Sequence, residues 1–403
     1  MLNVDVTVSE RVQAIEGMPD RASLTAEIDR LCRLSVQALP AMYRTDSQEF
    51  VQTVRRDPTA PNGLRQEGTN LRYAAIAALG LAWIEPAGQR MALDGWTAAE
   101  LARHTTELAL RPGTDLGAAA LAGWARAEIA SELAPELYQR LVRDVREVTS
   151  QPTVDFSWAL TALVAAAELG DFAEPAALAA ERLLAAQGGN GIWGHHLPRT
   201  DLARYRAHVG CFADQVYPIQ ALARYARATG DQRALAAANR CADRIVQLQG
   251  DAGQWWWHYD ARTGDVVEGF PVYSVHQHAM APMALFDLLE AGGNDHRDAI
   301  VDGVGWLTDH PESSLPLIDP ETGAIWRKIG RKEPRKATRS LRAVSTAISP
   351  RWKLKVLDSV FKPGVVDYEC RPYELGWLLY AWLSGGAAGG RSAATPEPPT
   401  AHG

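Results

Sequence analysis

Cysteine, long apolar runs and excess positive charge are all scarce in this sequence, and each scarcity excludes a class of protein. Among 403 residues there are four cysteines, Cys32, Cys211, Cys241 and Cys370, which lie far apart and form no CxxC pair. A disulfide framework is therefore not expected, and a reducing compartment is the default. The formal net charge of −7 gives no indication of general nucleic-acid binding.

Apolar runs long enough to cross a membrane are also missing. A transmembrane helix needs about 18 or more consecutive apolar residues, and no run of that length occurs. Residues 1–20 contain neither the basic segment nor the apolar segment of a secretory signal. We therefore expect no transmembrane segment and no secretory signal, and we predict a cytoplasmic location.

Apolar segments with helical periodicity dominate what is present. Hydrophobic residues make up 47% of the chain and charged residues 22%, which is typical of a soluble globular protein. Six times, a polar, turn-rich segment ends in a few reactive side chains and an Ala/Leu-rich helix begins at once. These six expected helices span residues 74–82, 116–127, 159–169, 219–228, 279–289 and 375–383.

Amphipathic helices are expected between these six, for example at residues 136–149, 174–186, 231–249 and 296–307. The alternation recurs roughly every 40 to 60 residues, which is typical of a helical repeat. Helices that are apolar all round belong to an inner ring, and helices with a polar face belong outside it. The sequence therefore predicts an all-α fold, an (α/α)6 toroid with all inner N-termini on one face.

The predicted toroid occupies residues 64–384 and contains one insertion, at about residues 309–363. Residues 1–63 are predicted to form an N-terminal helical leader, and residues 385–403, rich in Gly, Ala and Pro, a disordered tail. The insertion holds a cationic run, which we interpret either as a solvated surface or as a contact for an anionic ligand or a membrane surface. The run comprises Arg327, Lys328, Arg331, Lys332, Arg335, Lys336, Arg339 and Arg342.

Residues 254–290 concentrate aromatic and imidazole rings directly before one expected inner helix. The rings are those of Trp255, Trp256, Trp257, His258, Tyr259, Tyr273, His276 and His278. Large rings are costly to expose, so this crowding indicates a pocket wall at a helix N-terminus. The alternative is a tryptophan-stacked loop that seals the end of a helical bundle, although His and Asp suit such a seal poorly.

In a toroid, the residues just before each inner helix converge on one mouth. They are Asn70, Arg72, Tyr73, Asp115, Asp155, Trp158, Asp214, Gln215, Tyr217, His276, His278, Glu369, Arg371 and Glu374. Aromatic faces can hold a sugar ring, carboxylates or imidazoles can transfer protons, and arginine can bind a carboxylate or phosphate. Asp115, Asp155 and Asp214 have a second interpretation as helix N-caps, where aspartate is favoured.

Two short motifs, residues 187–193 (QGGNGIW) and 249–255 (QGDAGQW), match the Q-x3-G-x-W core of the QW repeat, and residues 323–326 (GAIW) keep part of it. The repeat resembles that of the squalene cyclase and protein prenyltransferase superfamily, whose fold is an α-toroid. Similar turns occur in (α/α)6 carbohydrate enzymes, including some polysaccharide lyases. The resemblance implies architecture and no catalytic residue, because the D-x-D-D acid and the D-D-x-x-D metal motif are both missing.

The leading hypothesis is a carbohydrate-active enzyme of the six-hairpin toroid type, which catalyses hydrolysis, epimerisation or β-elimination of a sugar or uronate. Among toroid enzymes, sugar 2-epimerases use paired histidines and unsaturated glucuronyl hydrolases use paired aspartates, and this chain offers candidates for both. The predicted catalytic residues are His276 or His278 as the acid/base, with Asp155, Asp214 and Glu374. The predicted substrate-binding residues are Asn70, Arg72, Tyr73, Trp158, Tyr217, Trp255, Trp256, Trp257, His258, Tyr259, Tyr273, Glu369 and Arg371, with Arg72 and Arg371 as anion clamps.

Three alternatives stay open beside this hypothesis. A terpenoid or prenyl cyclase with a non-standard acid would use the same aromatic wall for carbocations and the basic run for pyrophosphate. A non-catalytic toroid would bind a glycan or a protein. A Zn²⁺ site of Cys211, Cys370 and either His276 or His278 has no supporting local spacing, so no metal or other cofactor is predicted. The predicted partner is a small-molecule or oligosaccharide substrate.

Overall fold

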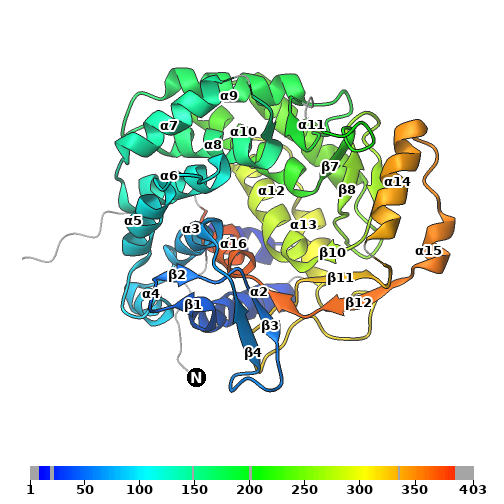
Figure 1. Ribbon diagram of the computed structural model, residues 1–403, viewed down its shortest axis with the longest axis horizontal. Coiled ribbons are helices and arrows are strands. Elements are labelled where there is room, and N and C mark those ends of the chain that lie inside the picture. The colour runs from blue at the N-terminus through cyan, green and yellow to red at the C-terminus, as the bar shows by residue number, and fades with distance from the viewer. Residues whose placement is uncertain (1–8, 19–21, 148, 199–201, 335, 386–403) are drawn as a thin grey trace, which may run out of the picture.

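The six apolar, Ala-rich segments form an inner ring of helices. A computed structural model describes residues 9–18, 22–147, 149–198, 202–334 and 336–385 of the chain. The inner helices are α3 (Leu71–Leu81), α6 (Leu116–Ala130), α8 (Thr153–Ala165), α10 (Ala213–Thr229), α12 (Ala281–Glu290) and α16 (Pro372–Leu383). Each inner helix contacts the next, and α16 contacts α3, so the ring is closed (Figure 1). The predicted (α/α)6 toroid is confirmed.

Amphipathic helices form the outer ring. They are α2 (Ala22–Ala38), α5 (Ala98–Ala109), α7 (Pro135–Arg146), α9 (Ala173–Ala186), α11 (Gln232–Gln247) and α13 (Arg297–Gly305). In α7, Leu137, Leu141 and Val145 are buried at a spacing of four, as expected for one apolar face. Because α2 packs against α16, the segment predicted as a leader contributes an outer helix. The predicted domain boundaries themselves stay a prediction.

Short antiparallel strands precede the inner helices, where the sequence predicted only polar approach segments. Three-stranded sheets have the orders β13-β3-β4, β7-β8-β9 and β10-β11-β12. Their strands are β3 (Thr53–Arg56), β4 (Leu64–Glu67), β7 (Val209–Cys211), β8 (His258–Asp260), β9 (Val266–Glu268), β10 (Val272–Tyr273), β11 (Lys328–Arg331), β12 (Pro363–Asp367) and β13 (Glu369–Cys370). Since β7, β10 and β13 lead into α10, a π-helical turn η3 (His276–Met280) and α16, the strands position the first turns of these inner helices.

Shorter elements complete the described chain. Two-stranded pairs join β1 (Tyr43–Arg44) to β2 (Glu49–Phe50) and β5 (Gln151–Pro152) to β6 (His196–Leu197). The short helices are α1 (Glu10–Glu16), η1 (Leu39–Met42) and α4 (Pro86–Ala92), and all three pack against α2. They cover the outside of the ring near the point where it closes.

The two Q-x3-G-x-W segments make matching contacts. In each, the glutamine amide donates to the carbonyl oxygen of the motif's own glycine and to that of an alanine in the next outer helix. These bonds join Gln187 to Gly191 (3.0 Å) and Ala237 (2.8 Å), and Gln249 to Gly253 (2.9 Å) and Ala299 (2.9 Å). The tryptophans that end the motifs, Trp193 and Trp255, are fully buried. Each motif therefore ties one outer helix to the next, which is an architectural role.

Residues 337–365, the last part of the cationic insertion and the two residues after it, form an arm at the edge of the toroid (Figure 1). Its helices are α14 (Ala337–Ile348) and α15 (Val356–Val360), and strands β11 and β12 flank them. Two arginines of the predicted run, Arg331 and Arg342, have buried side chains that form ion pairs. Each lies 3.0 Å from Glu268. Asp358 lies 2.6 Å from Arg331 and 2.8 Å from Arg342. The solvated-surface interpretation is therefore wrong for these arginines.

Two predictions fall partly outside the described residues. Arg335 of the cationic run lies there, and so do residues 386–403 of the predicted tail. Among the helices of the described ranges, none combines the length and the apolarity needed to cross a bilayer.

Candidate active site

A pocket of about 300 Å³ lies where the inner helices begin. Residues from α3, α8, α10, η3 and α16 line it, so five inner N-termini converge on one space. Eight lining residues are among those predicted: Asn70, Arg72, Tyr73, Trp158, Tyr217, Trp257, Tyr273 and His276. Arg327, Cys211 and Tyr373 also line it. Arg327 belongs to the cationic run interpreted as a possible anionic-ligand contact and Cys211 to the alternative Zn²⁺ set, whereas Tyr373 was not predicted.

Helices α8 and α10 begin earlier than predicted, which changes how their reactive residues are presented. Asp155 and Trp158 lie three residues apart in α8, and Asp214 and Tyr217 lie three apart in α10. Residues at this spacing share one helix face, so each pair points the same way. The N-cap interpretation is wrong for both aspartates, because Pro152 and Phe212 occupy those positions. It is confirmed for Asp115, which caps α6 through the Ala118 amide at 2.8 Å.

Arg72 joins two carboxylates at one side of the pocket. Its guanidinium donates to both oxygens of Asp155 at 2.7 Å and to Asp115 at 2.5 Å. It also lies 5.4 Å from the centre of the Trp158 ring, in the geometry of a cation–π contact. Burial raises the pKa of Asp155, and the charge of Arg72 opposes that rise. Asp155 is therefore a buried carboxylate that binds a proton more readily than a solvated one.

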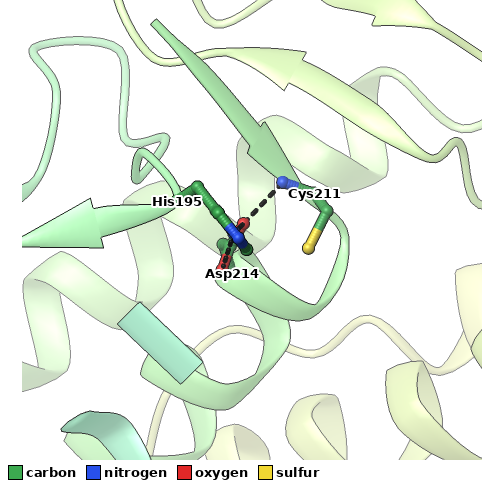
Figure 2. A group of neighbouring side chains, drawn as sticks. All are labelled: His195, Cys211 and Asp214. Carbon is green, nitrogen blue, oxygen red and sulfur yellow. Dashed lines mark hydrogen bonds and ion pairs between the residues drawn. The ribbon is translucent and has the colours of Figure 1, made fainter. Parts of the chain in front are cut away.

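His195, Cys211 and Asp214 form a second polar cluster beside the pocket (Figure 2). Asp214 is fully buried, accepts a hydrogen bond from the Cys211 amide at 2.7 Å, and lies 3.0 Å from Nδ1 of His195. The His195 side chain is 42% exposed. The hydrogen bond and the charge of Asp214 raise the pKa of His195. Sequence reasoning missed His195, although it follows the Trp193 motif end by two residues.

The same three residues could hold a metal ion, since their ligand atoms all lie within 4.8 Å of one another. A thiolate, an imidazole and a carboxylate would suit Zn²⁺. However, burial raises the pKa of the Cys211 thiol, and Asp214 is already engaged by the His195 imidazole and the Cys211 amide. The alternative set of Cys211, Cys370 and either His276 or His278 is not a group of this kind within the described residues. The close approach of His195 and Asp214 is explained by a hydrogen bond between the imidazole and the carboxylate.

Asp214→Asn is expected to lower the pKa of His195, because the variant removes the negative charge that raises it. Because the pKa of His195 is raised in the folded state, its protonated form stabilises the fold fully below about pH 6.5, the unperturbed pKa of histidine. This stabilisation is lost as the pH rises through the pKa of the folded state. The difference in melting temperature between wild type and D214N should therefore be largest at acid pH. NMR titration of the imidazole signals measures the pKa, and an unchanged value would contradict the pairing.

His276 and His278 have different surroundings although they are two residues apart. His276 lines the pocket between the rings of Phe212 (4.4 Å) and Tyr273 (4.9 Å), and burial lowers its pKa to about 3. Its Nδ1 has no hydrogen-bond partner among the described residues. The His278 ring is completely buried and does not line the pocket, and burial lowers its pKa to about 3 as well. The prediction of a catalytic His278 is therefore not supported by its position.

Only one member of the tryptophan run reaches the pocket. Trp257 lines it, whereas Trp255 packs against Phe212 and Trp256 against Phe270. His258 is buried and stacks on Trp257 with ring centres 4.0 Å apart. Tyr259 is also fully buried and does not line the pocket. Most of this predicted wall therefore packs behind the pocket. Trp255 belongs to the architectural motif, and His258 and Tyr259 lie in β8 with their rings buried away from the cavity.

Glu369 and Glu374 hold arginines in place beside the pocket. Arg327 lies 3.3 Å from a carboxylate oxygen of each. Arg371 also contacts Glu369, at 3.1 Å, and donates to the Tyr73 hydroxyl at 3.0 Å. Burial raises the pKa of Glu374 to about 7, against the opposing charges of Arg327 and Arg371. Neither glutamate lines the pocket, and of the two arginines only Arg327 does.

The chain resembles known proteins in its structure. No protein-family model matches it, and no curated protein matches it in sequence. Solved structures do match. An unsaturated glucuronyl hydrolase from Bacillus sp. GL1 has a TM-score of 0.56 and 13% identity, over 87% of this chain and 96% of that one.

A possible member of family GH105 from Salmonella enterica has a TM-score of 0.56 and 9% identity, over 91% and 95% of the two chains. The unsaturated glucuronyl hydrolase from Streptococcus agalactiae has a TM-score of 0.52 and 12% identity, over 94% and 96%. At these identities the likeness shows the fold. The fold is the (α/α)6 toroid of these proteins. They give no support to the resemblance to terpenoid cyclases.

Proposed function

We propose that this chain is a carbohydrate-active hydrolase whose substrate is a saccharide that carries a carboxylate, such as a uronic acid. The observation that carries this proposal is the composition of the pocket, where aromatic rings meet the guanidinium groups of Arg72 and Arg327, with Asp155 and His195 directly behind the lining residues Arg72 and Cys211. The similar structures named unsaturated glucuronyl hydrolase support the same reaction class.

Aromatic rings and unpaired polar atoms suit the binding of a sugar. The pocket holds two aromatic pairs, Trp158 with Tyr217 (4.8 Å between ring centres) and Trp257 with Tyr273 (5.9 Å). Such rings pack against the apolar faces of a sugar. In the described part of the chain, Trp158 Nε1 and His276 Nδ1 are buried without a hydrogen-bond partner. Sugar hydroxyls would form hydrogen bonds with both atoms. A buried polar atom without a partner is costly, so a ligand that supplies these hydrogen bonds is favoured.

Positive charge at the pocket suits the carboxylate of a uronic acid. Arg327 lines the pocket, and its glutamate partners lie at 3.3 Å, which is longer than the usual 2.7 to 2.9 Å or so of a strong charge-assisted hydrogen bond. Burial together with neighbouring cations, including Arg339 and Arg327, lowers the pKa of Lys336. The cations around Lys336 therefore disfavour its charged form, and an anionic substrate beside them would relieve that repulsion.

Asp155 and His195 are the proton-transfer groups in this proposal. Neither lines the pocket itself, but each adjoins a residue that does: Asp155 is bonded to Arg72, and a ring nitrogen of His195 lies within 4.8 Å of the Cys211 sulfur. The pKa of Asp155 is raised by its burial, and the pKa of His195 is raised by the hydrogen bond and charge of Asp214, with a smaller contribution from the charge of Asp155.

Glycoside hydrolysis commonly uses a pair of carboxyl groups, one to protonate the leaving oxygen and one to assist the attacking water. In this proposal the His195 imidazole takes the place of one carboxyl group. His276 stays neutral because of its lowered pKa and acts as a hydrogen-bond partner of the sugar.

The proposal is tested with matched oligosaccharides that end in a uronate, an unsaturated uronate or the corresponding neutral sugar, with products detected by mass spectrometry. We expect cleavage of a uronate-ended substrate and at least tenfold poorer kcat/KM for the neutral analogue, in line with loss of about one charge-assisted bond. Arg327→Gln should raise KM for the uronate substrate by about tenfold and bring it close to the neutral one. Arg111→Gln, at an exposed arginine, is the control.

Two results would contradict parts of this proposal. Equal cleavage of the neutral analogue would remove the carboxylate requirement while keeping a hydrolase. Tight binding without cleavage of any member of the panel would support a toroid that binds glycans without catalysis.

A further inference from the structure

The arm, residues 337–365, exposes most of the large apolar side chains that are exposed in the described part of the chain. Six of them recur every three or four residues along α14, the connecting segment and α15. They are Leu341, Val344, Ile348, Trp352, Val356 and Val360. Ile348, Val356 and Val360 are each more than 60% exposed. Exposed apolar side chains gathered in one segment point to an interaction site in a folded protein, whereas scattered single residues do not.

Helix α14 is oriented opposite to an ordinary surface helix. Leu341, Val344 and Ile348 recur at a spacing of three and four and face outward, while Arg342 and Thr346 are buried. A helix that covers a protein core buries its apolar face instead. The apolar face of α14 is therefore turned away from the body of the protein.

Buried polar contacts fix this orientation. Arg342 donates to Glu268 at 3.0 Å and pairs with Asp358 at 2.8 Å. Thr346 contacts Nε2 of His208 at 2.9 Å. Rotating α14 to bury its leucine and isoleucine would break both Arg342 pairs and leave the buried Glu268 with Arg331 as its remaining partner, which is destabilising. The outward apolar face is thus held by the fold.

The charge of the arm indicates what covers that face. Residues 337–365 contain six Lys/Arg (Arg339, Arg342, Arg351, Lys353, Lys355 and Lys362) and one acidic residue, Asp358, a balance of +5 in a chain whose net charge is −7. Asp358 is already paired with Arg331 and Arg342. Arg351, Lys355 and Lys362 are exposed beside the apolar side chains. Interleaved aliphatic, tryptophan and cationic residues are typical of a segment that lies in the interface of an anionic bilayer.

Other occupants fit less well. A symmetric contact between two copies through the arm would set the same cations against one another. A polyanionic glycan would match the cations but would leave Leu341, Ile348 and Val356 in water. We propose that the arm docks on the surface of an anionic lipid bilayer, with its aliphatic side chains and Trp352 among the lipids and Arg351, Lys355 and Lys362 at the headgroups.

Docking would also place the pocket near the lipid surface. The Arg339 guanidinium of α14 lies 5.1 Å from the centre of the Trp257 ring, and Trp257 lines the pocket. The inward side of the arm therefore contacts a pocket wall, while its outward side is free. This inference does not depend on the reaction proposed above.

Co-sedimentation of the full chain with vesicles tests the inference without any substrate. We expect binding to vesicles of phosphatidylcholine mixed with phosphatidylglycerol, little binding to phosphatidylcholine alone, and weaker binding as salt is raised. Ile348→Ser with Val356→Ser, and separately Arg351→Glu with Lys355→Glu, should each lower the partition coefficient by about tenfold or more. These side chains are exposed, so the melting temperature should stay close to that of the wild type.

The matched control is Leu110→Ser with Arg111→Glu, an exposed apolar residue and an exposed cation that follow α5 on the far side of the toroid from the arm (Figure 1). It should bind vesicles as the wild type does. The inference is overturned if the wild type does not bind the anionic vesicles, or if the control loses binding as much as the arm variants do. It is also overturned if light scattering shows a dimer that I348S/V356S dissociates, or if polygalacturonate retains the chain and the vesicles do not.

Discussion

Asp155→Asn is expected to lower kcat on the uronate-ended substrate by about 10²- to 10⁴-fold, the range for losing a general acid or base. Asparagine keeps the shape of the side chain and one hydrogen-bond acceptor for Arg72, but it cannot carry the transferred proton. Asp155 is the buried partner of Arg72, bonded through both oxygens at 2.7 Å, and burial raises its pKa. Steady-state kinetics measures the effect, and the melting temperature checks that the fold is intact.

Asp115→Asn is the matched comparison for this prediction. Asp115 accepts from the same guanidinium, at 2.5 Å, but its side chain is 56% exposed. If the carboxylates act only by holding Arg72, the two variants should lose similar activity. If Asp155 transfers the proton, D115N should keep activity within about tenfold of the wild type. Equal losses would therefore remove the proton-transfer role from Asp155 and leave it a positioning residue.

Gly80→Ala is expected to destabilise the protein by roughly 3 kcal/mol, at the upper end of the range for overpacking. Gly80 in α3 faces Gly376 in α16, and a Cβ atom at residue 80 would lie 2.2 Å from the Gly376 carbonyl oxygen. A Cβ at residue 376 would meet the carbonyl oxygen of Ile76 at 2.8 Å. Backbone atoms are the obstacle, so the two helices must separate. This contact closes the inner ring between its first and last helices.

Thermal or denaturant unfolding measures this loss, and Gly305→Ala provides the control. A Cβ at residue 305 meets nothing within 4 Å, and the residue lies at the end of α13. Alanine is a better helix former than glycine, so G305A should match or slightly exceed wild-type stability. Because Gly80 and Gly376 form one contact, G80A and G376A combined should cost less than the sum of the single variants. If the losses in stability of G80A and G376A add fully in the double variant, or if G80A is as stable as the wild type, the contact between Gly80 and Gly376 does not limit how closely α3 and α16 pack.

Much of the fold could be predicted because its cause is local. Apolar residues all round a helix predict an inner position, and a polar face predicts an outer one, as in α6 and α7. The glutamine and tryptophan motifs also act locally, since each spans one turn and reaches only the next outer helix. The short strands before the inner helices were not predicted, because their partners lie far away in the sequence: β3 pairs with β13.

The candidate site was predictable only in part. Convergence of the inner N-termini placed Arg72, Trp158, Tyr217 and His276 correctly at the pocket. The hydrogen-bond partner of Asp214 was missed: it is His195, which comes from a preceding loop, whereas the prediction had grouped Asp214 with His276 or His278. Loop paths have no period that the sequence displays, so the approach of His195 could not be read from spacing.

The sequence by itself determined the ring of alternating helices and the glycines that let its ends meet, because helical periodicity and the absence of a Cβ are properties of the residues themselves. Only the tertiary structure decided which rings face the pocket. His276 and His278 differ by two positions in one π-helical turn, and that turn sends one ring into the cavity and the other into the core. The apolar face of α14 points outward for the same kind of reason: Arg342 on its opposite face binds Glu268, which is distant in sequence.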